Sequence, residues 1–84
     1  MNILSQDGKI LVNHDNIASL YIQKIYRQYA HPDTWWEIRA MYSAVSEDCL
    51  YDTIARFEDE KECESVFKRI VNEICEQKLG LVMI

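Results

Sequence analysis

The 84-residue chain has little of what several specialised classes of protein require. With only two glycines and one proline, the chain contains neither a glycine-rich phosphate loop nor a flexible linker rich in these residues. Three cysteines are an odd number without disulfide-scaffold spacing, which favours a reducing compartment, so we expect a cytoplasmic protein. No apolar run approaches the roughly 20 residues of a membrane span, and the start lacks the basic segment of a signal peptide. We therefore expect a single domain over residues 1–84, without membrane contact.

Catalytic and metal-binding residues are also sparse. His14-Asp15 resembles half of a metal site, but such a site needs three or four convergent ligands, and no Cys-x-x-Cys or Glu-x-x-His accompanies it. Cys49 has acidic neighbours, which raise a thiol pKa and disfavour a nucleophile. Paired carboxylates at 58–64 are the groups that glycosidases use, but the helix dipole explains acidic residues at a helix start better. We expect no enzyme, no cofactor and no metal.

The segment 57–80 carries the clearest helical pattern. Asp59 stands before the first periodic residue as an N-cap, and Glu62 can complete a capping box. Gly80 suits the left-handed position after a helix end. We predict a helix over about 60–78. Its apolar stripe has spacings of three and four and comprises Cys63, Val66, Phe67, Ile70, Val71 and Ile74.

The rest of the chain favours β-structure. Asp7-Gly8 lies between two β-prone runs and predicts a hairpin with strands at about 2–5 and 9–12, followed by a turn at 13–16. Longer strands are expected at 17–29, 34–43 and 49–57, and the apolar tail 81–84 suits an edge strand or a docking segment. The predicted fold class is α+β: an antiparallel meander of four or five strands, with one C-terminal α-helix packed across one face.

The hairpin between 17–29 and 34–43 turns around Ala30-His31-Pro32-Asp33. A five-residue loop predicts pairing of Arg27 with Glu37 and of Tyr26 with Ile38. This register separates an apolar face, which includes Trp36, from a second face that alternates cations with aromatic residues. Lys24 is then a misfit on the apolar face, where a long side chain can reach solvent. The candidate interaction residues on the second face are Tyr21, Arg27, Tyr29, Trp35 and Arg39.

Two motifs resemble a group of short uncharacterised proteins of Gram-positive bacteria and their phages. One is the opening Ser5-Gln6-Asp7-Gly8-Lys9 with Leu11-Val12-Asn13 and Asp15-Asn16-Ile17. The other is the strand-to-helix passage Ala55-Arg56-Phe57-Glu58-Asp59-Glu60. The resemblance implies a sheet strand that leads into a closing helix, and a mobile-element or phage setting. It implies no activity and no functional residues.

The aromatic and cationic face indicates binding. Tyr, Trp, Met and Arg are enriched in the cores of protein interfaces, and one helix can cover only one face of the hairpin. Aromatic residues beside cations also stack on single-stranded bases, but the net charge of −5 does not favour direct nucleic-acid binding. We therefore expect a non-enzymatic protein-interaction module. The same face, with the tail 81–84, is expected to let the protein associate with itself as a homodimer.

The excess negative charge is local, since residues 47–64 hold eight acidic and two basic side chains. Exposed carboxylates on a small fold can occupy a basic groove that normally holds nucleic acid. The alternative function is thus a phage-encoded, anti-CRISPR-like inhibitor of a host defence nuclease. The simpler interpretation is solvated helix surface, as the Glu64–Lys68 spacing suggests. The acidic candidates are Glu58, Glu60, Glu62 and Glu64.

Overall fold

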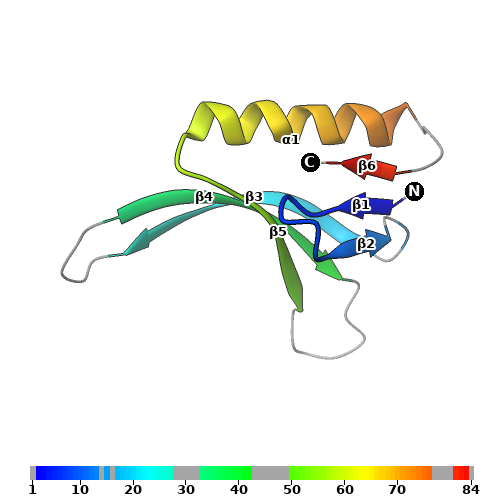
Figure 1. Cartoon of the computed structure of the whole chain (residues 1–84), viewed down its shortest axis with the longest axis horizontal. Coiled ribbons are helices and arrows are strands. Elements are labelled where there is room, and N and C mark those ends of the chain that lie inside the picture. The colour runs from blue at the N-terminus through cyan, green and yellow to red at the C-terminus, as the bar shows by residue number, and fades with distance from the viewer. Residues whose placement is uncertain are drawn as a thin grey trace.

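The computed structural model describes residues 2–13, 15, 17–27, 33–42, 50–76 and 81–83. Within these residues the chain forms six strands and one helix (Figure 1). In order they are β1 (Asn2–Leu4), β2 (Leu11–Asn13), β3 (Ile17–Arg27), β4 (Asp33–Tyr42), β5 (Tyr51–Phe57), α1 (Glu60–Cys75) and β6 (Leu81–Met83). The segment 43–49, between the strands predicted at 34–43 and 49–57, lies outside the described residues. The one helix of the described residues is too short and too polar to cross a membrane.

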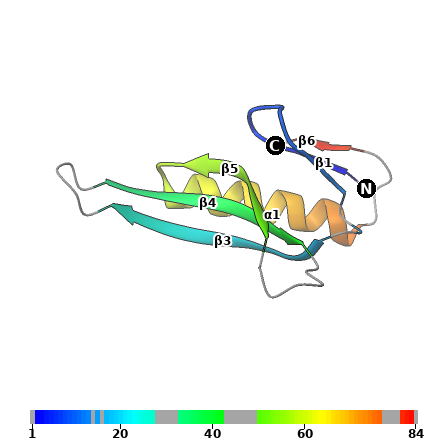
Figure 2. The ribbon, with the colours of Figure 1, turned by 90° about the horizontal axis from the view of Figure 1, so that it is seen from below.

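The strands form two sheets of three strands each. The longer strands make an antiparallel sheet in the order β3-β4-β5, as predicted, and α1 lies along one side of it (Figures 1 and 2). The short strands make a second sheet in the order β2-β1-β6, in which β6 runs parallel to β1. The predicted α+β class with a C-terminal helix is confirmed. The tail residues 81–83 form a strand, which pairs with β1 and adds the third strand to the small sheet.

The predicted Asp-Gly hairpin joins β1 to β2. Gly8 has φ +72°, a left-handed conformation that glycine adopts without a steric penalty. The Asp7 Oδ1 atom accepts hydrogen bonds from Ser5 Oγ at 2.6 Å and from the Lys9 amide at 3.0 Å. Both hydrogen bonds lower the pKa of the Asp7 carboxyl, and the bond from Ser5 has the larger effect. The turn therefore holds itself together with its own side chains.

The predicted register of the long hairpin is wrong, although the predicted faces are right. Arg27 lies opposite Asp33, and Glu37 lies opposite Gln23, so the pairing is displaced from the predicted one. The observed register pairs the opposite charges of Arg27 and Asp33 at the hairpin end of the two strands. The displacement is by four residues, an even number, and therefore keeps every side chain on its predicted face. Lys24 is exposed, with its Nζ 6.0 Å from the centre of the Trp36 ring.

A bulge in β5 joins the two sheets. Ile38 pairs with Ala55 but the next residue, Arg39, pairs with Thr53, so Ile54 is an extra residue. As a result Ile54 and Ala55, although consecutive, are both buried. The Gln6 amide donates to the Ile54 carbonyl at 2.8 Å, and the Gln6 side-chain oxygen accepts from the Arg56 amide at 3.0 Å. Gln6 thus ties the first hairpin to the bulged strand.

The helix starts as predicted and ends earlier. Asp59 is the N-cap, and its Oδ1 accepts from the Lys61 amide at 3.1 Å. The helix ends at Cys75 rather than near residue 78, and Glu76, whose N–H donates to the Asn72 carbonyl, is its C-cap. Gly80, the predicted terminator, lies outside the described residues. The core lies between α1 and the sheets and includes Ile3, Val12, Ile38, Ala40, Ile54, Ala55, Phe57, Cys63 and Ile70.

Candidate protein-binding face

Because α1 packs on one side only, the β3–β4–β5 sheet has a second side that no element of the described chain covers (Figure 1). Strand alternation and the observed registers decide which residues point there. We call this surface the helix-free face. It comprises Ser19, Tyr21, Gln23, Ile25 and Arg27 of β3, Asp33, Trp35, Glu37, Arg39 and Met41 of β4, and Tyr51, Thr53 and Arg56 of β5.

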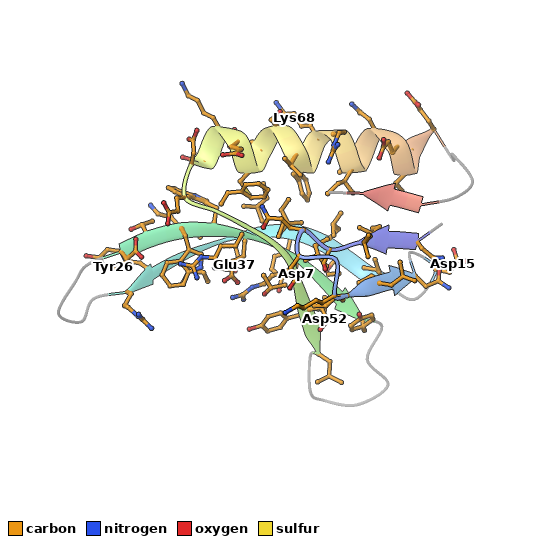
Figure 3. The ribbon with its side chains drawn as sticks, viewed as in Figure 1. Asp7, Asp15, Tyr26, Glu37, Asp52 and Lys68 are labelled. Atoms are coloured by element: carbon orange, nitrogen blue, oxygen red, sulfur yellow. The ribbon has the colours of Figure 1, made fainter. Side chains whose placement is uncertain are left out.

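Glu37 is the centre of this face. Its Oε2 atom accepts a hydrogen bond from Trp35 Nε1 at 2.8 Å. Its Oε1 atom accepts from Arg39 Nε at 2.9 Å and Nη2 at 2.8 Å, and from Thr53 Oγ1 at 3.2 Å. Four donor atoms from three side chains therefore hold one carboxylate, and they come from two adjacent strands. Figure 3 shows Glu37 on the sheet and Lys68 on the outer side of α1.

Two arginines lie on aromatic rings of the same face. The Arg56 Cζ atom is 4.2 Å from the centre of the Trp35 ring, and the Arg39 Cζ atom is 4.3 Å from the centre of the Tyr51 ring. Both distances are within the range of cation–π attraction. The side chains cover one another so well that Arg39 and Glu37 are only 16% and 14% exposed. The face is therefore ordered before any partner arrives.

The electrostatics match this geometry. Burial by itself raises the pKa of Glu37, but the hydrogen bonds from Trp35 and Arg39 and the Arg39 charge outweigh it, so the pKa is lowered. Burial likewise lowers the pKa of Arg39, and the hydrogen bond and charge of Glu37 more than reverse this. Tyr21 adds a further hydrogen bond to Arg39 that raises its pKa. The pair is thus charged at neutral pH.

The structure brings together four of the five predicted residues of this face: Tyr21, Arg27, Trp35 and Arg39. Tyr29 lies outside the described residues. The predicted Arg27–Glu37 pair is wrong, because Glu37 binds Arg39 on its own strand. The sequence interpretation also missed Tyr51, Thr53 and Arg56, which β5 contributes. The spacing of Trp35, Glu37 and Arg39 at every second residue is the signal that could have revealed the centre.

The four predicted acidic residues are all exposed but do not share one side of the helix. Glu60 and Glu64 are four residues apart and lie on one flank of α1. Glu62 lies about 200° around the axis from Glu60, on the other flank. Glu58 precedes the helix. The acidic surface therefore wraps around the start of α1 instead of forming a flat array.

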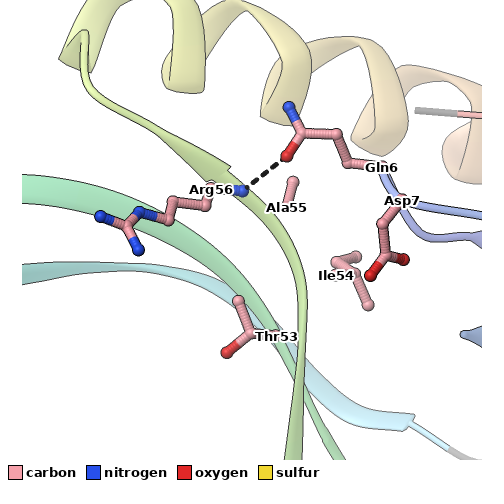
Figure 4. Close-up of a pocket in the computed structure, with 6 residues that line it drawn as sticks. All are labelled: Gln6, Asp7, Thr53, Ile54, Ala55 and Arg56. Carbon is pink, nitrogen blue, oxygen red and sulfur yellow. Dashed lines mark hydrogen bonds between the residues drawn. The ribbon is translucent and has the colours of Figure 1, made fainter. Parts of the chain in front are cut away.

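Two shallow hollows accompany these surfaces. One of about 160 Å³ lies at the β5 bulge, where Gln6 and Asp7 meet Thr53, Ile54, Ala55 and Arg56 (Figure 4). The other, of about 230 Å³, is an apolar groove between β3 and α1. Both are smaller than the roughly 300–1,000 Å³ of typical small-molecule sites. Among the described residues no three metal-ligating side chains converge.

The cysteines separate by environment. Cys63 is fully buried on the apolar stripe. Its burial, and to a smaller extent the charges of Glu64 and Glu60, raise the pKa of its thiol to about 11. Cys75 is exposed at the helix end. Cys49 and His14 lie outside the described residues. Comparisons of this chain with protein-family models, with curated proteins and with solved structures find no significant match.

Proposed function

We propose that this protein is a cytoplasmic, non-enzymatic protein-interaction module that binds its partner through the helix-free face. The observation that carries the proposal is the array around Glu37, in which two arginines stack on Trp35 and Tyr51. Trp, Tyr, Arg and Met are the residues that dominate the centres of protein interfaces. Because these side chains are already fixed by one another, binding loses less side-chain entropy.

The charges suggest the chemistry of the partner surface. The helix-free face carries Arg27, Arg39 and Arg56 against two carboxylates, so it has a small positive excess. The Arg56 guanidinium stacks on Trp35, and it forms no ion pair with any of the described residues. We infer that the partner presents a carboxylate to Arg56, together with an apolar or aromatic area that covers Tyr51. Tyr51 is 47% exposed, which is high for so large an apolar ring.

The same contacts argue against direct nucleic-acid binding. Base stacking requires the open face of an aromatic ring. One face of Trp35 and one face of Tyr51 are already occupied by guanidinium groups. The chain is also acidic overall, whereas phosphate binding depends on a positive footprint.

The proposal is tested by charge reversal at an exposed position of the face. Tagged protein is used to isolate its partner from cells of the source organism, and affinity is then measured with purified components. Arg56→Glu should weaken binding by at least about tenfold, as loss of a central interface residue does. Lys68→Glu makes the same charge change on the outer side of α1 and should leave the affinity unchanged. Equal weakening by both variants, or by neither, would contradict the proposal.

A second candidate rests on the exposure of Glu58, Glu60, Glu62 and Glu64 around the start of α1. In a phage setting, we propose as the alternative that this surface occupies the basic groove of a host nuclease in place of nucleic acid. Such association would be fast and sensitive to salt.

A further inference from the structure

The outer edge of β3 has no strand partner within the described part of the chain. Its inner edge pairs with β4 over its whole length, from Ile17 to Arg27. An edge strand presents a row of backbone N–H and C=O groups to which another strand can bind. Figure 2 shows β3 along the margin of the molecule opposite to β1 and β6.

The opposite edge of the same sheet, formed by β5, is in contact with another part of the chain. There the chain's own first hairpin reaches β5, and the Gln6 amide donates to the Ile54 carbonyl. The Gln6 side chain accepts from the Arg56 amide (Figure 4). The bulge at Ile54 also distorts that edge, a feature that protects against further pairing. The fold therefore closes one edge of the β3–β4–β5 sheet, while β3 receives no such contact among the described residues.

The first part of β3 also lacks the usual protective residues. Natural edges are protected by proline, by charged side chains or by a bulge. The segment 17–23 contains no proline and no charged residue, and its one irregularity is at its start, between Ile17 and Ser19. The charged residues Lys24 and Arg27 come only toward the hairpin end.

An apolar groove runs beside this uncharged segment. It is formed by residues 17–20 of β3 and by Val71, Ile74 and Cys75 of α1, and it has a volume of about 230 Å³. The helix contacts β3 less than it contacts β4, and Leu20 and Ile22 are only half-buried. A strand added to β3 would bring a new row of side chains over this groove.

We propose that the occupant is β3 of a second copy of this chain, paired antiparallel about a twofold axis at Tyr21. This register is self-complementary. Leu20 lies opposite the partner's Ile22 on the groove side, and Ser19 lies opposite the partner's Gln23 on the helix-free side. Lys24 lies opposite the partner's Ala18, so no two like charges face each other. Cross-strand pairs of this kind stabilise antiparallel sheets.

The resulting dimer has one six-stranded sheet with both helices on the same side. The paired segment of about seven residues is roughly 23 Å long. With its two rows of side chains it buries roughly 500 Å² per copy, below the roughly 800 Å² of a standard stable interface. We therefore expect a weak, reversible association, so that dimers form in a concentration-dependent way. The two helix-free faces then form one continuous surface, which would bind a partner bivalently.

Two measurements test this dimer. Sedimentation velocity over a range of concentrations up to about 1 mM should show a reversible monomer–dimer equilibrium. Arg56→Glu, which tests the proposed function, lies on β5, two strands away from β3, and should leave this equilibrium unchanged. The proposed dimer and the proposed partner-binding face can therefore be refuted independently of each other.

Cysteine cross-linking tests the register, in a background with Cys49→Ser and Cys75→Ser. Tyr21→Cys should form an intermolecular disulfide, because facing residues on the axis have Cα atoms about 4.5–5.5 Å apart. Ser19→Cys mixed with Gln23→Cys should cross-link, whereas Gln23→Cys alone should not. The Ser19→Cys and Gln23→Cys variants both keep Tyr21, so their cross-linking still tests the register if Tyr21→Cys is unstable.

Met41→Cys is the matched control on the same face of β4. In the proposed dimer the two β4 strands are about 14 Å apart, too far for a disulfide. A cross-link at Met41 without one at Tyr21 would show that the copies meet through their helix-free faces and would overturn the proposal. A monomer at every concentration would overturn it as well.

Discussion

Glu37 and Arg39 stand two residues apart on β4 and form an ion pair at 2.8 Å on the side of the sheet away from the helix. Each also interacts with aromatic residues: Glu37 accepts from Trp35, and Arg39 lies over Tyr51. The pair thus organises side chains from β4 and β5 into one ordered surface. The predictions below concern this surface and the contacts that support it.

Replacing Glu37 with glutamine should lower the free energy of unfolding at neutral pH by about 2 kcal/mol, because charge-assisted hydrogen bonds are lost. The pKa of Glu37 is lowered in the folded state. Its contribution is therefore present above the ordinary carboxyl pKa and is lost as the pH falls through the folded value. The difference between wild type and Glu37→Gln should accordingly shrink in acid, as urea unfolding at several pH values would show.

Glu64→Gln is the matched control for this change, since Glu64 is exposed on α1. It should alter stability by no more than about 0.5 kcal/mol at any pH. A pH dependence of the Glu37→Gln difference no larger than that of Glu64→Gln would contradict the assigned role of Glu37.

Gln6 should contribute to stability through its side-chain oxygen. Gln6→Ala removes the acceptor of the Arg56 amide and should cost about 1 kcal/mol. Gln6→Glu replaces the amide oxygen with a carboxylate oxygen, which is also an acceptor, and should preserve most of this stability. Thermal or urea unfolding of the two variants provides the comparison. If Gln6→Ala and Gln6→Glu were equally destabilised, the hydrogen bond would not be the cause.

The two described cysteines should differ in reactivity. In a Cys49→Ser background, a thiol reagent should modify Cys75 rapidly in the native protein and Cys63 only after unfolding. Cys63 is buried and its pKa is raised to about 11, so little thiolate is present at neutral pH. Mass spectrometry after timed labelling would show this order. Similar rates at both positions in the native state would mean that Cys63 is not buried between α1 and the sheets.

Reversing the charges of Glu58, Glu60, Glu62 and Glu64 to lysine separates the two proposed functions. If the partner binds the helix-free face, its affinity should change by less than about threefold, because these residues lie on or next to α1. If the alternative is right, binding should disappear and wild-type binding should weaken strongly with salt. Affinity measured at low and high ionic strength distinguishes these results.

Much of the fold follows from local pattern. The Asp7-Gly8 turn, the Asp59 cap and the buried stripe with Cys63 and Ile70 each depend on neighbouring residues, and the structure confirms them. The alternation along β3 and β4 also predicted which side chains share a face, since that depends only on strand periodicity.

What could not be predicted depends on contacts between distant segments. The hairpin register required knowing where the turn begins, and the third strand of the small sheet required β6 to return to β1. The centre of the candidate face was missed for the same reason. Thr53 and Arg56 reach it only because the bulge at Ile54 changes the direction of side chains along β5.

The most direct test of the central claim is photo-crosslinking in cells from two exposed positions. A photoreactive residue at Gln23 lies on the helix-free face, and one at Lys68 lies on the outer side of α1. The account predicts that Gln23 yields a cross-link to one discrete protein other than a second copy of this chain, that Arg56→Glu abolishes this cross-link, and that Lys68 yields none. A cross-link to that partner from Lys68 but not from Gln23 would contradict the account.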